Sequence, residues 1–244
     1  MVSTDATYSF TVTGDRNLVA NFYDTSNCPL LYSFNDDDHT ATVIGHCEGQ
    51  SATGELVIPE TIVHNGESYT VTAIGDDALR DCIGLTSISF GNTLTSIGER
   101  AFWHCEGLTS VVLPNSLVSI ASEAFRYCYS LTEINIPSSV TSIGLHVLTG
   151  EDPYEGSKNP FSTCWNLASI TVDPENSYYD SRNNCNAIIE TATNKLVSAS
   201  SSTIIPNTVT EIGWDAFILY RTPCIKTTLH QVQPILITIT VSGH

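Results

Sequence analysis

The stretch "CIGLTSISFGNTLTSIGERAFWHC", Cys82 to Cys105, decides the fold because the chain repeats it at once. The next stretch, "CEGLTSVVLPNSLVSIASEAFRYC", runs from Cys105 to Cys128 with the same spacing of 23 residues between its cysteines. A third copy, "CYSLTEINIPSSVTSIGLHVLTG", starts at Cys128, and its next cysteine, Cys164, follows after 36 residues. A fixed period of roughly 20 to 50 residues is typical of stacked repeat units.

Incomplete copies flank these units. Upstream, "GELVIPE" and "VTAIGDDALRDC" supply the two halves of a first unit, and downstream "CWNLASITV" opens a unit that breaks at Val172. That last unit resumes at "IIPNTVTEIGWDAF", Ile204 to Phe217, so about five units extend from roughly 54 to 217. The period predicts an α/β repeat solenoid that is rich in β-structure, with a parallel sheet and short helical or turn segments.

Apolar residues recur at the same positions of each unit, which predicts ladders of side chains down the interior. About six buried side chains per unit contribute roughly 1.5 to 3 kcal/mol each before chain entropy is subtracted, so one unit alone would not fold. In the unit from Cys82 these positions are Leu85, Ile88, Phe90, Leu94, Ile97, Ala101 and Phe102.

Four cysteines fall at one repeat position, just before the strand: Cys82, Cys105, Cys128 and Cys164. Successive parallel strands lie about 4.8 Å apart, and identical positions point their Cβ atoms in parallel, further apart than the roughly 3.8 Å of a disulfide. We therefore expect a ladder of buried free thiols, and no C-x-x-C pair suggests zinc. Whether Cys28 and Cys47 are bridged stays open, because connectivity cannot be deduced from sequence.

The segment "LTSVVLPNSLVSIASEAFRYC" closely resembles the BspA-like class of bacterial leucine-rich repeats. The resemblance implies a right-handed leucine-rich-repeat solenoid, displayed at the cell surface, where members adhere to host matrix proteins and other cells. Residues 2–22 resemble the closing strands of an InlB-type B-repeat domain. The segment "VDPENSYYDSRNNCNAIIETATNKLVSASSSTIIPNTVTEIG" resembles the hairpin-bearing repeat variant of the class.

Four regions are expected along the chain. The first is a terminal hairpin of a truncated B-repeat-like β domain, and the second is a β-rich cap with the incomplete first repeat. The third is the solenoid with insertions at 149–160 and 173–203, and the fourth is an atypical tail, either an unusual cap or the product of a shifted reading frame. Their bounds are 1–22, 23–81, 82–217 and 218–244.

The ends of the chain suggest a piece of a longer protein. The opening residues have neither the basic segment nor the apolar segment of a secretory signal, so we expect any export signal to lie upstream of Met1. An array that stops without a polar cap exposes its last unit, so the tail offers a surface for association. We otherwise expect a monomer.

The charge excludes two classes of partner. The chain has a formal net charge of −17, from 26 acidic and 9 basic residues, whereas nucleic acid and anionic membrane surfaces require a cationic footprint. No run of 18 apolar residues occurs, so no membrane insertion is expected.

No motif predicts catalysis, a cofactor or a metal. The seven histidines show neither H-x-x-x-H nor H-E-x-x-H spacing. The segment "NDDDH", Asn35 to His39, lacks the spacing of a calcium loop and is interpreted as a solvated turn. "GQSATG", Gly49 to Gly54, lacks the spacing of a nucleophile elbow. Open repeat surfaces also offer no cleft in which two carboxylates converge, so we expect no enzyme.

The outward face of the sheet is the first candidate ligand surface, because parallel strands place one repeat position of every unit in a column. Small hydroxyls dominate, giving a flat hydrogen-bonding surface, although Ser and Thr also simply suit exposed strands. One column is Ser87, Ser110, Glu133 and Ser169, and the next is Ser89, Val112, Asn135 and Thr171. The insertion "GEDPYEGSKNPF" is a second candidate, with Tyr154 and Phe161 displayed on a loop.

Two functions remain open at this stage. The first is a surface or secreted adhesion module that binds an extracellular protein or glycan, and the second is a passive spacer within a larger bacterial surface protein. An exposed aromatic cluster would favour the first, and the two columns contain none.

Overall fold

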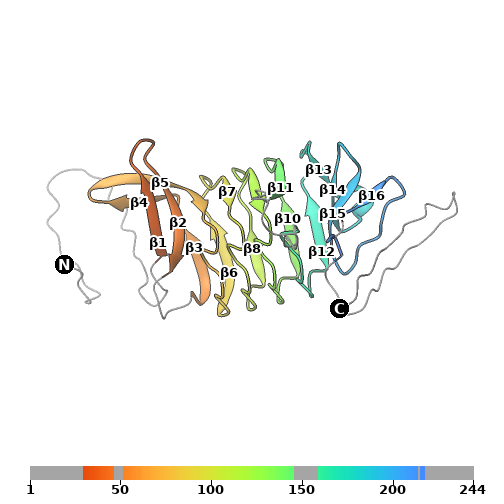
Figure 1. Ribbon diagram of the computed structural model, residues 1–244, viewed down its shortest axis with the longest axis horizontal. Helices are drawn as coiled ribbons and strands as arrows, with labels where there is room; N and C mark the ends of the chain where they lie inside the picture. The colour runs from red at the N-terminus through yellow and green to blue at the C-terminus, as the bar shows by residue number, and fades with distance from the viewer. Residues whose placement is uncertain (1–29, 47–51, 146–158, 214, 218–244) are drawn as a thin grey trace, which may run out of the picture.

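The computed structural model describes residues 30–46, 52–145, 159–213 and 215–217, and these residues form a strand-rich fold. In Figure 1 the strands lie side by side along the long axis, beginning with β1 and ending with β16. The described residues include a single short 3₁₀ helix, Arg182–Asn184. The predictions for residues 1–22, for Cys28 and Cys47, for Tyr154 and for the tail 218–244 lie outside the described residues.

Antiparallel strands form the amino-terminal end of this array. The hairpin of β1 (Leu30–Asn35) and β2 (Thr40–His46) leads to β5 (Glu67–Ile74), which pairs parallel with β2 and antiparallel with β4 (Thr61–His64). In the β1–β2 turn the Asn35 side chain accepts the Asp37 amide at 3.1 Å, and Asp38 accepts the Thr40 amide at 3.2 Å. These side-chain hydrogen bonds stabilise the turn, which agrees with the interpretation of "NDDDH" as a solvated turn.

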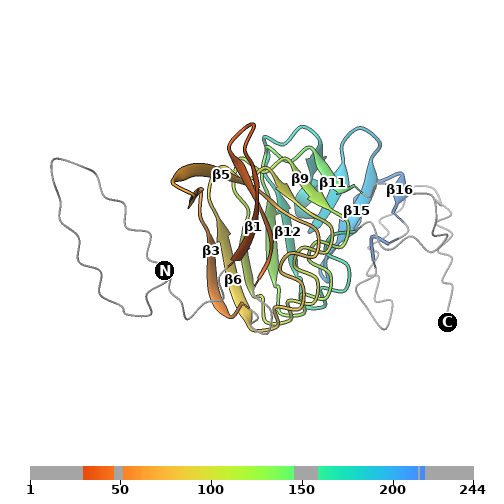
Figure 2. The same cartoon turned by 60° about the vertical axis from the view of Figure 1, so that its left-hand side comes forward.

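Parallel strands make two walls around the core. The first wall contains β3 (Gly54–Ile58), β6 (Leu85–Phe90) and β8 (Ser110–Val112), followed by the pair β10 (Glu133–Ile136) and β12 (Ser169–Val172). The second wall continues from β5 through β7 (Ser96–Ile97), β9 (Ser119–Ala121) and β11 (Ser142–Leu145). Figure 2 shows the walls standing apart, with β3 and β6 on one side and β9 and β11 on the other.

Equivalent residues of successive units pair with each other. Ser96 pairs with Ser119 and Ile97 with Ile120, while the Thr95 amide donates to the Thr72 carbonyl, 23 residues earlier, at 2.8 Å. The isoleucines are buried and the serines are half-buried. A slip by one residue would turn the buried set outward, so the alternating pattern fixes the register.

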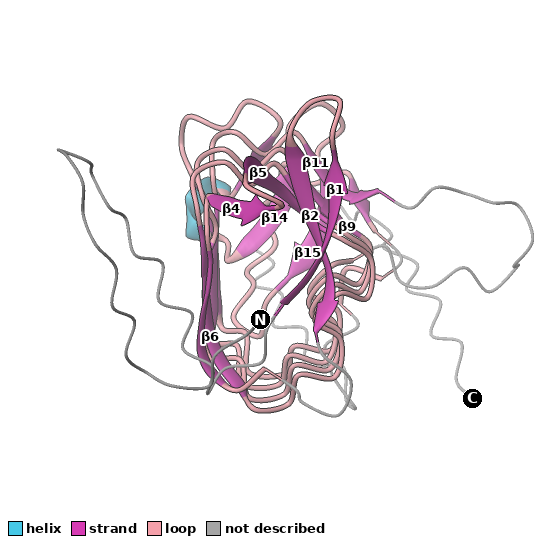
Figure 3. Ribbon diagram, turned by 90° about the vertical axis from the view of Figure 1, so that its left-hand side faces the viewer, coloured by secondary structure: helices cyan, strands magenta, loops and turns pink. Residues whose placement is uncertain are grey.

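Among the described residues, turns and not helices connect the second wall back to the first, and they stack as a third side visible end-on in Figure 3. The Phe102 amide donates to the Ala124 carbonyl at 2.7 Å, which joins one turn to the next. His104 and Tyr127 have φ of 63° and 64°, a region that costs energy for residues other than glycine. The hydrogen bonds between turns hold these residues there, because a relaxed backbone would break them.

Three phenylalanine rings form the centre of the core. Phe102 stacks on Phe125 with centroids 5.0 Å apart, and Phe125 stacks on Phe161 at 5.6 Å. All three are fully buried. The prediction that Phe161 is displayed on a loop is therefore wrong, because Phe161 occupies the repeat position of Phe125 after the insertion and completes the same stack.

A hairpin follows β12 within residues 173–203. It consists of β13 (Tyr179–Asp180), β14 (Ala187–Glu190) and β15 (Lys195–Ala199), which pair antiparallel in that order. The last described strand, β16 (Glu211–Ile212), pairs parallel with β15. A separate core lies beneath this sheet, made of Cys185, Ala187, Ile189, Leu196, Ala199, Val209 and Ala216.

The phenylalanine stack generates a stability prediction. Replacing Phe125 by alanine removes the ring that contacts both neighbours, so we expect the free energy of unfolding to fall by about 3 to 5 kcal/mol. Urea denaturation measures this change. Phe125→Leu, which retains most of the apolar volume, should cost clearly less, and equal losses in the two variants would contradict the stack as the source of the stability.

Candidate functional site

The predicted columns lie where the register places them on the first wall. Ser87 pairs with Ser110 and Ser89 with Val112 across β6 and β8. Glu133 pairs with Ser169 and Asn135 with Thr171 across β10 and β12. Alternate residues of the same strands, Ile88, Val111, Ile134 and Ile170, are buried. The eight predicted residues therefore share the outward side of the wall, opposite the core.

This wall is less polar than the sequence suggested. Val57 on β3 pairs with Ser89, which in turn pairs with Val112, and the two valines are 69% and 63% exposed. Further along, the Thr171 hydroxyl donates to the Asn135 side chain at 2.8 Å, so these two polar groups already satisfy each other in part. The wall offers a shallow mixture of methyl and hydroxyl groups without an aromatic residue in the two columns.

A continuous strip of aromatic rings lies on the turn side instead. We call it the aromatic strip, and it consists of Trp103, His104, Tyr127, Tyr129 and Trp165. The centroids of Trp103 and Tyr127 lie 5.2 Å apart, those of Tyr127 and Tyr129 5.9 Å, and those of Tyr129 and Trp165 4.3 Å. Trp165 is 40% exposed and the other four are half-buried.

The repeat places these rings together. His104 and Tyr127 stand two residues after a buried phenylalanine, whereas Tyr129 and Trp165 directly follow a ladder cysteine. The signal was present in "AFWHC", "AFRYC", "CYS" and "CWN", but the sequence indicated the strand columns and the insertion loop instead. Residues flanking a buried position of a turn face outward, and stacking the turns aligns them.

Charged groups surround the strip. The Arg80 guanidinium lies over the Trp103 ring, 4.1 Å from its centroid, and that of Arg126 lies 4.7 Å from the Tyr127 centroid. His104 lies between two carboxylates, with Nδ1 2.8 Å from Asp81 and Nε2 2.8 Å from Glu106. The strip thus combines aromatic faces with guanidinium groups and a carboxylate-flanked imidazole.

The cysteine ladder lies directly beneath the strip. The described cysteines of the ladder are free and fully buried. The thiols of Cys105, Cys128 and Cys164 donate to the carbonyls of Leu79, Phe102 and Phe125 at 3.1 to 3.3 Å. Each thiol satisfies one turn carbonyl, so the ladder supports the turns that carry the rings.

Burial governs the ionisation of these thiols. It raises the pKa of Cys128 well above its ordinary value and that of Cys164 to about 12. A hydrogen bond with Cys82, together with burial, raises the pKa of Cys105. The thiolate is the nucleophile and metal ligand, so Cys105, Cys128 and Cys164, whose pKa values are raised, stay neutral and unreactive near neutral pH, whereas the hydrogen bond with Cys105 lowers the pKa of Cys82 to about 7.

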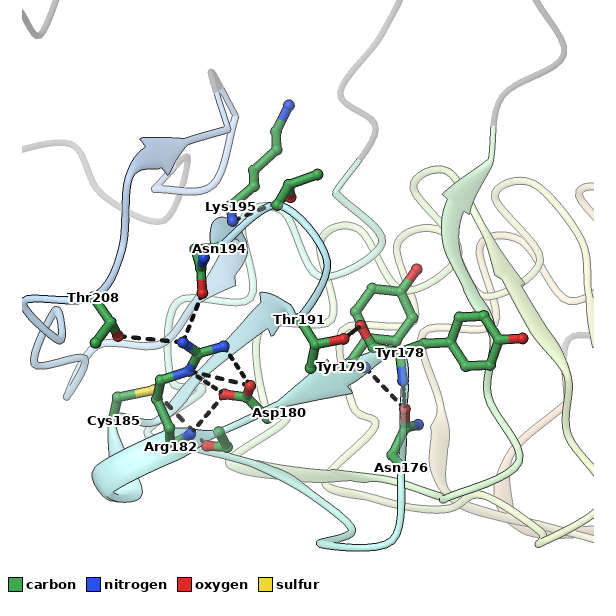
Figure 4. A network of polar contacts seen from close by, with 12 residues as sticks. Asn176, Tyr178, Tyr179, Asp180, Arg182, Cys185, Thr191, Asn194, Lys195 and Thr208 are labelled. Carbon is green, nitrogen blue, oxygen red and sulfur yellow. Dashed lines mark hydrogen bonds and ion pairs between the residues drawn. The ribbon is translucent and has the colours of Figure 1, made fainter.

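A second polar cluster joins the hairpin to β16, as Figure 4 shows. Arg182 donates from Nε to Asp180 at 2.8 Å, and from Nη1 to Asn194 at 2.8 Å and to Thr208 at 3.3 Å. The Asp180 carboxylate raises the pKa of the guanidinium. The hydrogen bonds hold Arg182 in place between chain segments, which makes the cluster a structural clamp.

The described part of the chain contains no group of three or more His, Cys, Asp or Glu residues arranged to hold a metal ion. Nor does any helix among the described residues have the length and apolarity needed to cross a membrane.

Residues 67–155 match the family described as "BspA type Leucine rich repeat region", in six copies. No curated protein matches the chain.

Solved structures of leucine-rich repeat proteins are similar to this chain. One, from Bacteroides capillosus, is 28% identical, with 59% of this chain and 94% of that chain covered and a TM-score of 0.48. Another, from T. pallidum, is 19% identical, with 75% and 78% covered and a TM-score of 0.46. A leucine-rich cell surface protein from Faecalibacterium prausnitzii is 21% identical, with 82% and 68% covered and a TM-score of 0.36.

The thiol ladder predicts how stability depends on pH. A cysteine thiol in the unfolded chain has a pKa of about 8.5, whereas the pKa of Cys164 in the folded protein is about 12. Above about pH 8.5 the unfolded chain therefore binds fewer protons, and the free energy of unfolding falls by at most about 1.4 kcal/mol per pH unit for each such thiol. Urea denaturation from about pH 8 to about pH 10 should show a shallower fall in Cys164→Ala.

A matched control separates titration from packing. Leu167→Ala removes another fully buried side chain from the same unit but no titrating group. It should lower stability without changing the pH slope, and a Cys164→Ala variant that keeps the original slope would contradict the assignment.

Proposed function

Because residues 67–155 belong to the BspA-type leucine-rich repeat family, we propose that this chain is a non-enzymatic adhesion module that binds an extracellular protein or glycan at a bacterial cell surface. The aromatic strip is the observation that carries the proposal. It presents Trp and Tyr rings with flanking Arg residues, the three residue types that dominate binding hot spots.

The arrangement of the rings supports a role in binding. Tyr129 and Trp165 stack with an interplanar angle of 26°, and Trp165 keeps 40% of its surface exposed although it touches another ring. Exposed apolar area in one continuous strip costs solubility, and such patches commonly mark interaction sites. Rings held by neighbours also lose little conformational entropy when a ligand binds.

The outward face of the first wall is a second candidate surface. The exposed Val57 and Val112 flank Ser89 in one row, which gives an extended ligand both methyl groups and a hydroxyl to contact. We propose that this face extends the site for a long ligand, since repeat arrays commonly bind along their sheets.

The architecture that we propose is a right-handed solenoid with a period of about 23 residues. Hydrogen bonds from Thr95 to Thr72 and from Thr109 to Thr86, each spanning 23 residues, support this period. The region 82–217 forms the solenoid in this proposal, the residues before it form a cap, and the module is held at the surface within a longer polypeptide. A passive spacer remains the alternative function, and it requires no ligand.

A binding panel tests the proposal. The full chain is offered to immobilised fibrinogen, extracellular matrix proteins and host glycans, beside a double variant Tyr129→Ala and Trp165→Ala. We expect saturable binding to at least one of them, weakened about tenfold or more in the double variant because two central rings are lost.

Two further variants locate the site. Ser89→Arg with Asn135→Arg alters the first wall alone, and Tyr178→Ala removes a 52% exposed ring outside the strip as a matched control. If only the variant Ser89→Arg with Asn135→Arg loses binding, the site lies on the first wall. Absence of binding across the panel would support the spacer.

A further inference from the structure

We propose that Trp165, at the end of the aromatic strip, receives an arginine side chain from a basic segment of a partner protein. The inference rests on the proposed function and narrows its ligand to a cationic polypeptide. Three observations lead to it: the strip already binds the chain's own arginines, no arginine of the described residues lies over Trp165, and the described cations are all paired with carboxylates.

The chain's own arginines show how the strip holds a guanidinium. Arg80 lies over Trp103 at 4.1 Å while its Nη1 reaches Asp77 at 3.2 Å and its Nε reaches Asp81 at 3.4 Å. Arg126 repeats the arrangement over Tyr127, paired with Glu123. In both cases a guanidinium covers a ring face while carboxylates bind its edge, which is the geometry that favours arginine over lysine.

The described chain supplies no arginine at the corresponding position near Trp165. Arg80 and Arg126 each directly follow the residue equivalent to the buried phenylalanine, and that position, three residues before Trp165, is the buried Ser162. Among the described residues, the cation–ring contacts are those of Arg80 and Arg126, and neither involves Trp165. Trp165 therefore offers the best aromatic face for a cation, 40% exposed, without an arginine of the described chain on it.

Charge selects a cationic partner. Every Lys and Arg in the described residues is paired with a carboxylate: Arg80, Arg100, Arg126, Arg182 and Lys195. Because the chain as a whole has a net charge of −17, the electrostatic potential around the protein is negative. Such a field raises the rate at which a basic segment meets the surface and disfavours acidic ligands.

A carboxylate also lies beside the strip, next to His104. Glu106 occupies the repeat position of Tyr129 and Trp165 in the preceding unit, and it pairs with His104 at 2.8 Å. A basic segment that runs along the strip from Trp165 would thus pass from ring faces to acidic groups.

Titration with synthetic peptides tests the inference. The full chain is titrated with nona-arginine and with nona-lysine, and binding is followed by the indole resonances of the tryptophans. We expect the arginine peptide to bind more tightly than the lysine peptide and to shift the Trp165 resonance. Trp165→Leu keeps apolar bulk but loses the ring, so the affinity for nona-arginine should fall about fivefold.

Matched controls make the outcome decisive. Tyr178→Ala removes an exposed ring elsewhere without changing charge, so it should alter the affinity by less than about twofold, and melting curves establish that both variants are folded. Equal effects of Trp165→Leu and Tyr178→Ala, or equal affinities for the two peptides, would overturn the inference. A neutral oligosaccharide that binds in place of nona-arginine, and is lost in Trp165→Leu, would overturn it while leaving the adhesion function intact.

Discussion

The in-register hydrogen bonding of equivalent residues in successive units is the constraint on which the structure depends. The amides of Thr95, Val118 and Thr141 donate in series to the carbonyls of Thr72, Thr95 and Val118 at 2.8 to 2.9 Å. Each bond pairs a backbone donor of one unit with a backbone acceptor of the preceding unit. Once this series is fixed, every side chain has its counterpart in the next unit as its neighbour, so a single repeat position becomes a ladder.

The same register makes both the interior and the surface. Inside, it stacks Phe102, Phe125 and Phe161 and aligns the thiols that donate to turn carbonyls. Outside, it gathers the rings of the aromatic strip, although no two of its neighbouring units present identical residues. A shared backbone geometry thus allows the interior to stay uniform while the exposed positions vary, which is how a repeat array acquires a particular binding surface.

Much of the interior could be predicted from the sequence, because burial imposes a repeating demand on residue type. The free thiols at Cys82, Cys105, Cys128 and Cys164 are buried as their spacing indicated, and so are the apolar ladder positions of the unit from Cys82 except Phe90, which is half-buried. The family, too, was recognised from the repeat motif, and the match over residues 67–155 confirms it. The pairing of Ser89 with Val112 and of Asn135 with Thr171 likewise follows once the units are aligned on their cysteines.

The candidate site was harder to predict because it depends on turns. Backbone alternation indicates which strand residues face outward, but no such rule applies to His104 and Tyr127, which lie in turns and have positive φ values. Phe161 was wrongly predicted to be exposed, because it stands next to a long insertion and resembles a loop residue in sequence. In the structure it is buried, because its ring completes the phenylalanine stack. Contacts across units, such as that of Tyr129 with Trp165, emerge only when the turns are superposed.

Deleting one unit, residues 105–127, and measuring thermal unfolding by circular dichroism tests the central claim most directly. The deletion joins His104 to Cys128 and leaves every remaining residue in register, so the account predicts a folded protein that unfolds cooperatively, with a lower melting temperature because one unit's burial is lost. Deletion of residues 105–115, which shifts the register, should abolish cooperative unfolding. If the two deletions behave alike, the stacking of equivalent positions does not determine this structure.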